Sequence, residues 1–167
     1  RKYTSAIIRQ RLVHKIAGLQ QYCIDRNRNG VTDSSRDISG DGRIQLTEMM
    51  PYGQDECVIL TINLGCNAGE VGPRAVAVDL DGNVWVGCYD DMAYFKLNPD
   101  TGAVIARYGA GGKPYGAAVD AEGYIWSVNR GTHNIVKINP DTGAIIRNIP
   151  MSNPYGIAID SGNNVWV

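Results

Sequence analysis

The chain has little of what a nucleic-acid-binding or membrane-spanning protein needs. Its 16 Lys and Arg residues are balanced by 17 Asp and Glu residues, so no general field would attract nucleic acid or anionic lipid. No apolar run approaches the ~20 residues that cross a bilayer as a helix. We therefore expect no nucleic-acid partner and no membrane span, and partners must be recognised by local features.

The usual signatures of a catalytic centre are also missing. The sequence has only two histidines, His14 and His133, and it contains no phosphate-binding Gly loop, no Ser-His-Asp order and no nucleophile motif. His133 lies in the turn sequence Arg130-Gly-Thr-His-Asn, where a surface histidine is the simpler interpretation. The residues themselves therefore assign no catalytic group.

Four cysteines form an even set, and none has the CxxC spacing of zinc or thioredoxin-like sites. Three connectivities are open. Cys23 and Cys57 bracket a polar segment, so we predict a bridge that closes its base, and Cys66 would then pair with Cys88. Bridges of this kind favour an oxidising location, either extracellular, at the cell surface or in the periplasm. No leader is visible, so any leader would lie outside this stretch.

One phrase occurs three times at nearly fixed spacing. It begins at Pro73, Pro114 and Pro154, which lie 41 and then 40 residues apart, and each copy places an Asp six positions later and a Trp six positions after that. Such a period is typical of repeat architectures. We expect the tryptophans to pack between units and the aspartates to cap backbone amides of a turn. These residues are Trp85, Trp126 and Trp166, and Asp79, Asp120 and Asp160.

Each unit contains four short β-prone runs. In the unit that begins at Pro114 they are 116–120, 124–128, 134–138 and 144–149, and the turn Asn139-Pro-Asp-Thr-Gly143 joins the last two. The preceding unit has the same turn at 98–102. One Phe beside 20 Gly residues also suits short strands and tight turns. Four strands in roughly 40 residues predict a β-propeller blade.

The units resemble those of NHL-type and streptogramin-lyase-like (virginiamycin B lyase-like) propellers, which repeat a Pro-Tyr-Gly-Ile-Ala-Ile-Asp…Gly-Asn-Val-Trp-Val phrase. The resemblance covers residues 73–167 and implies an all-β fold of four-stranded blades. It implies little about activity, because that fold carries enzymes, binders and scaffolds alike. Streptogramin-lyase-like enzymes are understood to use His and Glu with a divalent metal, but no catalytic pattern around His133 matches residue by residue.

Residues 37–48 match the twelve-residue calcium loop of an EF-hand. Counting Asp37 as position 1, oxygen side chains fall at positions 3 and 5, Gly42 supplies the sharp turn at position 6, and Glu48 stands at position 12. The predicted Ca²⁺ ligands are Asp37, Ser39, Asp41, the carbonyl of Arg43, Gln45 and Glu48.

A second loop just upstream follows the same pattern less completely. Its predicted ligands are Asp25, Asn27, Asn29, the carbonyl of Val31 and Asp33. Position 12 holds Arg36, and Asp37 one place later could substitute or bridge. We expect one Ca²⁺ site in the downstream loop and a second in this one.

Flanking helices are poorly encoded, because the two loops almost touch and Pro51 would end any helix after Glu48. A sensor that opens a groove is disfavoured, and a structural calcium clip with an affinity on the order of 10⁻⁴–10⁻³ M is expected.

The phase of the repeat divides the chain into six parts. They are a partial blade of late strands (1–17), an EF-hand-like calcium-loop insertion (18–56), the last strand of that first blade (57–72), two blades (73–113 and 114–153) and the first strands of a further blade (154–167). Known propellers have at least four blades, so we expect an incomplete ring, with the remaining blades on a longer polypeptide or in neighbouring subunits.

The first part admits two interpretations. Residues 13–17 resemble the third strand of a blade, whereas Ile8, Leu12, Ile16 and Leu19 fall at helical spacing and would suit an amphipathic helix over Ala6–Leu19. We prefer the strand.

Three functions remain open. The first is a secreted or cell-surface calcium-binding β-propeller that binds a protein or glycan partner as a binding or assembly module. The second is a streptogramin-lyase-like metal-dependent lyase whose catalytic residues lie mostly outside this stretch, and the third is a subunit of an extracellular filament or larger complex. Positions that differ between repeats, such as Arg74 in place of Tyr115 and Tyr155 and the loops 88–92 and 129–133, mark a candidate binding face.

Overall fold

The computed structural model describes residues 3–10, 13–20, 23–51, 53–66 and 72–167. Within these ranges the regular structure is strand, apart from the single 3₁₀ turn η1 (Leu46–Glu48). Contacts divide the chain into two units, one formed by residues 1–8 and 15–62 and the other by residues 9–14 and 63–167.

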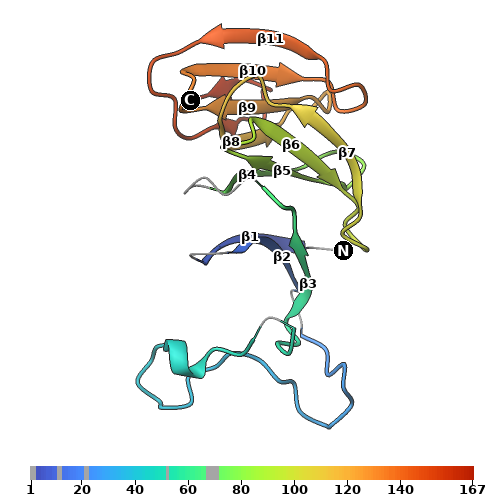
Figure 1. The fold of residues 1–167 in the computed structure, drawn as a ribbon, viewed down its shortest axis with the longest axis vertical. Coiled ribbons are helices and arrows are strands. Elements are labelled where there is room, and N and C mark those ends of the chain that lie inside the picture. The colour runs from blue at the N-terminus through green and yellow to red at the C-terminus, as the bar shows by residue number, and fades with distance from the viewer. Residues whose placement is uncertain (1–2, 11–12, 21–22, 52, 67–71) are drawn as a thin grey trace. The chain divides into compact units, whose positions relative to one another are not determined.

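A three-stranded sheet holds the start of the chain (Figure 1). Its strands, in hydrogen-bonded order, are β1 (Tyr3–Gln10), β2 (Val13–Gln20) and β3 (Val58–Asn63). The strand predicted over residues 13–17 is confirmed and the helix over Ala6–Leu19 is wrong. β2 pairs with β1 on one side and β3 on the other, and such long-range pairing overrides a weak local helical spacing. Leu12, on which that spacing partly rested, lies outside the described residues.

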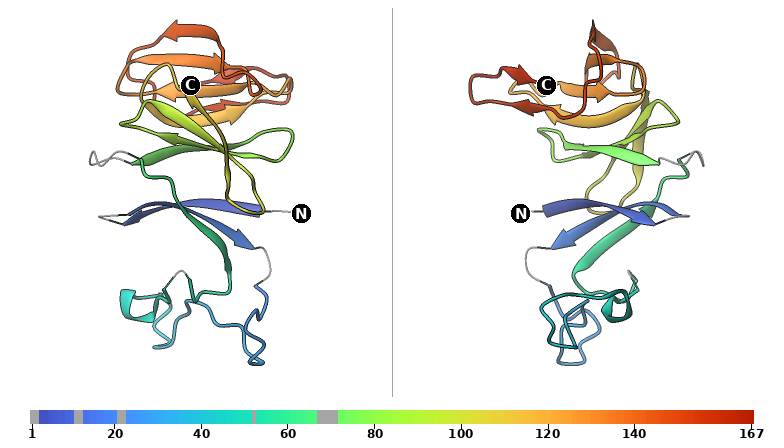
Figure 2. Two further views of the ribbon diagram at one scale, coloured as in Figure 1. Left: turned by 45° about the vertical axis from the view of Figure 1, so that its right-hand side comes forward. Right: turned by 90° about the vertical axis from the view of Figure 1, so that its left-hand side faces the viewer.

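Two four-stranded antiparallel sheets and the start of a third follow (Figures 1 and 2). The first sheet contains β4 (Pro73–Val78), β5 (Val84–Cys88), β6 (Ala93–Leu97) and β7 (Val104–Gly109). The second contains β8 (Pro114–Val119), β9 (Ile125–Asn129), β10 (Asn134–Ile138) and β11 (Ile145–Pro150). A short pair, β12 (Ala158–Ile159) and β13 (Val165–Trp166), begins the next unit. Each strand pairs with its neighbour in the sequence, and the described sheets do not close into a ring.

The two complete sheets have the same register. In each, the pairing of the first two strands shifts just after the initial proline, between Pro73 and Ala75 or between Pro114 and Gly116. The pairing of the last two strands shifts directly after a lysine, Lys96 in one sheet and Lys137 in the other. The 41-residue period of the sequence is therefore a structural period of one sheet.

An aspartate and a tryptophan lock the first hairpin of every repeat. The indole Nε1 of Trp85 donates to Asp79 Oδ2 at 2.9 Å, and the equivalent bonds from Trp126 to Asp120 and from Trp166 to Asp160 are also 2.9 Å. The other carboxylate oxygen of each aspartate accepts a backbone N–H four residues later, at 2.8–2.9 Å. The predicted capping role of the aspartates is confirmed.

A lysine from the third strand completes the arrangement in both full sheets. Lys96 Nζ lies 3.0 Å from Asp79 Oδ2, and Lys137 Nζ lies 2.8 Å from Asp120 Oδ2. The first pair is almost fully buried, with 9% of the Lys96 side chain and 3% of the Asp79 side chain exposed. A buried carboxylate is tolerated there because a cation and an indole N–H compensate its charge.

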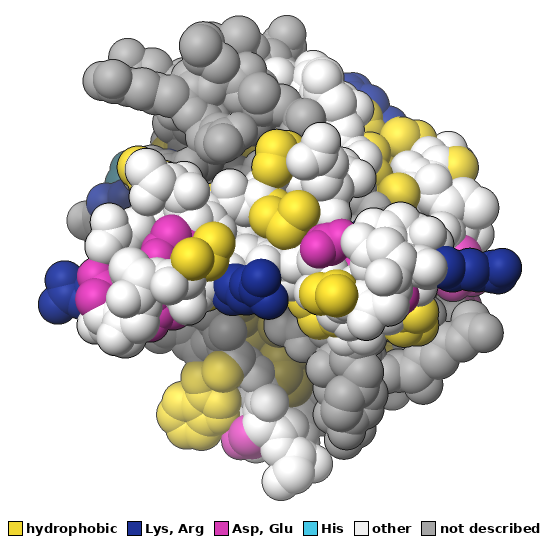
Figure 3. Space-filling view, turned by 90° about the horizontal axis from the view of Figure 1, so that it is seen from below, with side chains coloured by type: hydrophobic (Ala, Val, Ile, Leu, Met, Phe, Trp, Pro, Cys, Tyr) yellow, Lys and Arg dark blue, Asp and Glu magenta, His cyan; other side chains and the backbone are white. Residues whose placement is uncertain are grey.

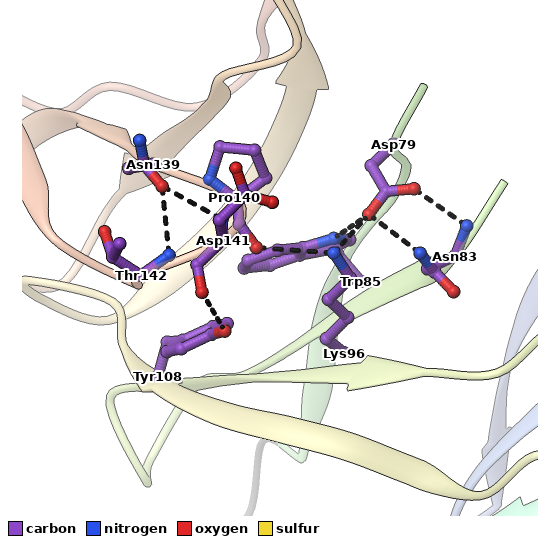
Figure 4. Close-up of polar contacts among 9 residues, drawn as sticks. All are labelled: Asp79, Asn83, Trp85, Lys96, Tyr108, Asn139, Pro140, Asp141 and Thr142. Carbon is purple, nitrogen blue, oxygen red and sulfur yellow. Dashed lines mark hydrogen bonds and ion pairs between the residues drawn. The ribbon is translucent and has the colours of Figure 1, made fainter. Parts of the chain in front are cut away.

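The first sheet also bonds directly to the second (Figure 4). Lys96 Nζ donates to the carbonyl of Pro140 at 3.3 Å, Tyr108 Oη donates to the carbonyl of Asp141 at 2.9 Å, and the Tyr108 ring stacks on Trp85 at 5.4 Å between centroids. The Asn-Pro-Asp-Thr-Gly turn of one repeat thus accepts hydrogen bonds from side chains of the preceding repeat.

The core lies between these two sheets. Its buried members are Ala75, Ala77, Trp85, Tyr94, Ala110, Ile125, Val136 and Ile138. The sheets approach closely at Gly87, where an added Cβ would lie 2.8 Å from the Pro114 side chain. Trp85 is fully buried, whereas Trp166, in the third repeat, is 62% exposed. The predicted packing of the tryptophan between units therefore holds for Trp85.

Replacing Asp79 by alanine should lower the free energy of unfolding of the unit that contains the blades (residues 9–14 and 63–167) by about 3–5 kcal/mol. The substitution leaves a buried Lys96 ammonium and a Trp85 N–H without their carboxylate. Asp160→Ala changes the same position of the repeat where it is exposed, and it serves as the matched control, with a much smaller effect expected. Urea denaturation followed by tryptophan fluorescence measures both variants. Equal destabilisation by the two substitutions would contradict a special contribution from the buried contacts of Asp79 with Lys96 and Trp85.

The stability of this unit should also fall in acid. Burial raises the pKa values of Asp79 and Asp120, but the tryptophan N–H and lysine partners outweigh it, so both pKa values lie below the ordinary 3.8. A carboxyl with a lowered folded-state pKa contributes stability above its unfolded-state pKa and loses it as the pH falls through its folded-state pKa. We expect a constant free energy of unfolding between about pH 5 and 7 and a decline below about pH 4. Urea titrations from pH 7 to pH 2.5 test this, and a flat profile would contradict it.

Candidate metal centre

The two predicted calcium loops have one backbone conformation. Counting Asp25 and Asp37 as position 1, the fourth residue of each loop has a positive φ, 59° at Arg28 and 75° at Gly40. The sixth residue does as well, with 89° at Gly30 and 82° at Gly42. Left-handed backbone at these two positions bends the chain so that successive side-chain oxygens face one interior.

The carboxylates at position 1 hold the turn in both loops. Asp25 accepts the backbone N–H groups of Asn29 and Gly30 at 3.2 and 2.8 Å. Asp37 accepts those of Asp41 and Gly42 at 3.2 and 2.7 Å, which are the same two loop positions. These bonds lower the pKa of Asp37, with the Gly42 N–H as the largest cause.

The residues at positions 5, 7 and 9 also form equivalent contacts in the two loops. At position 5, the side-chain oxygens of Asn29 and Asp41 each accept the backbone N–H of position 7, at 2.9 Å in both loops. The same residues contact position 9, through Asn29 Nδ2 to Asp33 Oδ2 at 2.8 Å and through Gln45 Nε2 to Asp41 Oδ2 at 2.7 Å. The residues at the positions where an EF-hand loop binds Ca²⁺ therefore contact one another in both loops.

The downstream loop is closed by its own position 12. The η1 turn brings Glu48 back over the loop, where Oε1 accepts the N–H groups of Ile38 and Ser39 at 3.0 and 2.7 Å. Oε2 accepts the N–H of Gln45 at 2.9 Å. These bonds lower the pKa of Glu48, the one from Gln45 most of all. Positions 2, 3 and 9 are thus tied to one carboxylate.

Glu56 closes the upstream loop in the same way. Its Oε1 accepts the N–H groups of Arg26 and Asn27 at 2.7 and 2.9 Å, and its Oε2 accepts that of Asp33 at 2.9 Å. These are again positions 2, 3 and 9. The sequence pattern offered Arg36 at position 12 and Asp37 as a substitute, but Asp37 is engaged within its own loop. The carboxylate that the pattern lacked comes from 20 residues beyond Arg36.

Several contacts hold Glu56 in this place. Its backbone N–H donates to the carbonyl of Asp33 at 2.8 Å, and the next residue, Cys57, is bonded to Cys23, with their Cα atoms 4.4 Å apart. Glu56 is only 4% exposed. The one sequence signal that points to it is an acidic residue directly before the cysteine that closes the base of the insertion.

Asp55 holds both ends of the upstream loop at its base. Its carboxylate accepts bonds from the backbone N–H and the hydroxyl of Ser35 at 3.1 and 2.8 Å, and Arg26 donates to the Asp55 carbonyl at 2.9 Å. Burial raises the pKa of Asp55, but the bonds from Ser35 and Cys57 outweigh it and leave the pKa lowered. A hollow of about 480 Å³ opens beside the upstream loop, lined in part by Asn27, Asp33 and Glu56.

The acidic side chains of the loops are not crowded into one patch. On the face drawn in Figure 3, acidic side chains form separate groups with hydrophobic side chains between them. Among the described residues, the group of three His, Cys, Asp or Glu ligand atoms gathered within 4.8 Å is Cys66, Cys88 and Asp91, whose cysteines are joined in a disulfide. Among the described loop residues no three such ligand atoms gather this closely, and a Ca²⁺ ion would also draw on amide, hydroxyl and carbonyl oxygens.

Both predicted disulfides are confirmed, Cys23 with Cys57 and Cys66 with Cys88, and no described cysteine is free. Two disulfides are typical of an oxidising compartment, extracellular or periplasmic. None of the described residues belongs to a helix with the length and hydropathy of a membrane span.

His133 has a structural role in its turn. It has a φ of 55°, is exposed, and its Nδ1 accepts the N–H of Asn153 at 3.2 Å while its carbonyl accepts that of Met151 at 2.9 Å. These bonds hold the segment that follows β11 and bring no carboxylate partner to the imidazole.

Solved structures share this fold. A catalytically inactive virginiamycin B lyase from Staphylococcus aureus, with quinupristin, matches 93% of this chain at a TM-score of 0.60 and 13% identity, and 42% of its own chain is covered. A streptogramin B lyase matches 95% at a TM-score of 0.55 and 17% identity, with 56% of its chain covered. Hydrazine synthase from Kuenenia stuttgartiensis matches 90% at a TM-score of 0.59 and 14% identity, with 34% covered.

The repeats are those of a β-propeller. The fold class is all-β with four-stranded blades, as in these lyase structures, and the described sheets do not close into a ring. The chain spans only 34–56% of the length of these three structures. No protein-family model and no curated protein sequence matches the chain.

Proposed function

We propose that the chain is a calcium-stabilised β-propeller segment that acts as a binding or assembly module in an extracellular or periplasmic setting. The observation that carries the proposal is the equivalence of the two loops, in which Glu48 and Glu56 accept the same three backbone amides. Glu48 is the bidentate ligand of the EF-hand pattern, and Glu56 takes that role in the upstream loop.

The ligand sets follow from this equivalence. The downstream ion would be bound by Asp37, Ser39, Asp41, the Arg43 carbonyl, Gln45 and Glu48. The upstream ion would be bound by Asp25, Asn27, Asn29, the Val31 carbonyl, Asp33 and Glu56. Six oxygen-donating residues for each ion agree with the six to eight oxygens that Ca²⁺ takes.

A structural role for the ions is supported by how little the insertion buries. Among its described residues between Cys23 and Cys57, the only two that are buried are Asp55 and Glu56, and both are acidic. Large hydrophobic side chains such as Leu46 and Ile38 are 88% and 71% exposed. A segment without an apolar core needs another source of order, and bound metal together with a disulfide is the usual one. The affinity expected for such an extracellular site is on the order of 10⁻⁴–10⁻³ M.

The propeller part supplies the binding role. Its frame is constant, and sequence differences such as those between 88–92 and 129–133 fall in turns, which is where propellers and other rigid scaffolds carry recognition. A protein or glycan partner and assembly with further blades or neighbouring subunits both agree with an open set of blades. A lyase role has less support, because likeness in fold at 13–17% identity does not transfer an activity and His133 contacts no carboxylate among the described residues.

Calorimetric titration of Ca²⁺ into the chain tests both sites. We expect two bound ions for the wild type and one for Glu56→Gln, because the amide cannot offer two anionic oxygens. Glu48→Gln should lose the other ion. Glu122→Gln alters an exposed glutamate in the β8–β9 turn and should keep both. Two ions with unchanged affinities in Glu56→Gln would contradict the assignment of Glu56.

Trypsin digestion tests the structural role separately. Arg28, Arg36 and Arg43 are exposed on the loops, so removal of Ca²⁺ with EGTA should speed cleavage after these residues by about tenfold or more, as loop opening becomes less costly. Mass spectrometry identifies the cut sites, and Mg²⁺ at the same concentration is the control for ionic strength. Equal cleavage rates with Ca²⁺ and with EGTA would argue that the ions do not order the loops.

A further inference from the structure

One asparagine of the upstream loop stands directly before a glycine. Asn29-Gly30 is the only Asn-Gly pair among the 167 residues of the sequence, and both residues are exposed to water. An asparagine is most reactive in such a pair, because glycine has no side chain to keep its own backbone nitrogen away from the asparagine amide. The contacts of this loop hold each of the reacting groups.

The backbone nitrogen of Gly30 is the nucleophile. Its N–H donates to Asp25 Oδ2 at 2.8 Å, so a carboxylate lies where the proton must leave. An N–H lies in the plane of its peptide group, so this bond leaves the two faces of the nitrogen free. A Cβ added at Gly30 would meet no atom within 4 Å apart from its chain neighbours, so nothing in the described chain crowds the residue.

The side-chain amide of Asn29 is the electrophile. Its Oδ1 accepts the N–H of Val31 at 2.9 Å, and because Val31 follows Gly30, this bond folds the side chain back over the Gly30 peptide. A donor on Oδ1 also stabilises the negative charge that develops there when Cγ is attacked. The nitrogen that must depart, Nδ2, donates to Asp33 Oδ2 at 2.8 Å.

The downstream loop has the same arrangement with an aspartate in place of the asparagine. Asp41 stands before Gly42, the Gly42 N–H donates to Asp37 Oδ2 at 2.7 Å, and Asp41 Oδ1 accepts the N–H of Arg43 at 2.9 Å. Loss of the amide from Asn29 would therefore give both loops the same residue at position 5.

We propose that Asn29 is a site of spontaneous deamidation. The Gly30 nitrogen forms a bond to Asn29 Cγ as its proton passes to Asp25, and the Cγ–Nδ2 bond breaks. The departing nitrogen takes up that proton and leaves as ammonia, so a five-membered succinimide remains. Water then opens the ring, at Cγ to give aspartate at position 29 or at the backbone carbonyl carbon to give isoaspartate.

The consequence for calcium rests on the proposed function. Aspartate at position 29 replaces a neutral ligand with an anionic one, and ligand charge is one of the factors that set the affinity of such loops. Isoaspartate lengthens the backbone by one carbon and shifts the later ligands, Val31 and Asp33, out of register. The upstream site thus gains affinity from one product and loses it with the other.

Peptide mapping of the whole chain, after incubation at mildly alkaline pH with Ca²⁺, tests the reaction. Trypsin releases residues 29–36, whose only side-chain amide is that of Asn29, and deamidation raises the mass of this peptide by about 1 Da. We expect the reaction to be at least about threefold faster in the folded chain than in concentrated urea, because the loop holds the groups together.

The same digest contains its own control. Residues 131–137 hold one amide, that of Asn134, which precedes an isoleucine and should stay unmodified. An unmodified peptide 29–36, or a rate in the folded chain no higher than the rate in urea, would overturn the proposal. The mass change requires no bound ion, so it is decided separately from the metal sites.

Asp41→Asn is the matched variant. It creates a second Asn-Gly pair with equivalent contacts, and trypsin releases this pair in residues 37–43, which hold no other side-chain amide. We expect the new asparagine to deamidate at a rate within about threefold of that of Asn29. A new pair that stays unmodified while Asn29 reacts would contradict the role of the loop contacts.

Calorimetric titration of Ca²⁺ into Asn29→Asp measures the effect on the upstream site. We expect its affinity to rise about tenfold while that of the downstream site stays unchanged. Asn98→Asp adds the same charge in a blade turn and should change neither affinity. Unchanged upstream affinity, with two ions bound, would contradict the calcium consequence alone. Binding of no ion by the wild type would refute the proposed metal sites, and the mass spectra would still decide the deamidation.

Discussion

The structure depends on carboxylates that accept hydrogen bonds from the backbone amides of their own turn. In the blades, Asp79, Asp120 and Asp160 each bind an amide four residues later and an indole N–H six residues later. In the insertion, Asp25 and Asp37 bind the amides at positions 5 and 6 of their loops. A charged acceptor makes such bonds stronger than neutral ones, so each turn is fixed by a single side chain.

What compensates the carboxylate differs between the two parts of the chain. In the blades the compensation is internal, because a lysine and a tryptophan from the same sheet surround the aspartate, and the apolar core between sheets supplies most of the stability. The insertion has no such core and gathers several acidic groups on two short loops. This contrast is the physical reason why we propose metal ions for the loops and not for the blades.

Much of the fold could be predicted from the sequence because its signals are local or periodic. The Pro-to-Asp-to-Trp spacing gave the strands of the blades, and the polar segment between Cys23 and Cys57 gave the disulfide pairing. The strand at 13–17 competed with a helical spacing, and its pairing with β1 and with β3, which lies more than 35 residues further along, decides between them.

The contacts of Glu56 and those around Arg74 could not be predicted from the sequence. A loop motif counts positions along one segment, so it cannot find a carboxylate such as Glu56, which contacts the upstream loop from beyond the end of the second loop. Arg74 stood out as a departure from the repeat, but its guanidinium stacks on the Tyr115 ring, which Arg130 and Tyr89 reach from turns of two different blades. Their proximity depends on how the sheets stack, and no spacing in the sequence encodes it.

Anomalous diffraction from crystals grown with saturating calcium tests the central claim most directly. We expect two anomalous peaks, one in each loop, with the upstream ion bound by both carboxylate oxygens of Glu56 at about 2.3–2.6 Å. A single peak at the downstream loop, or a Glu56 side chain turned away from the upstream ion, would contradict it.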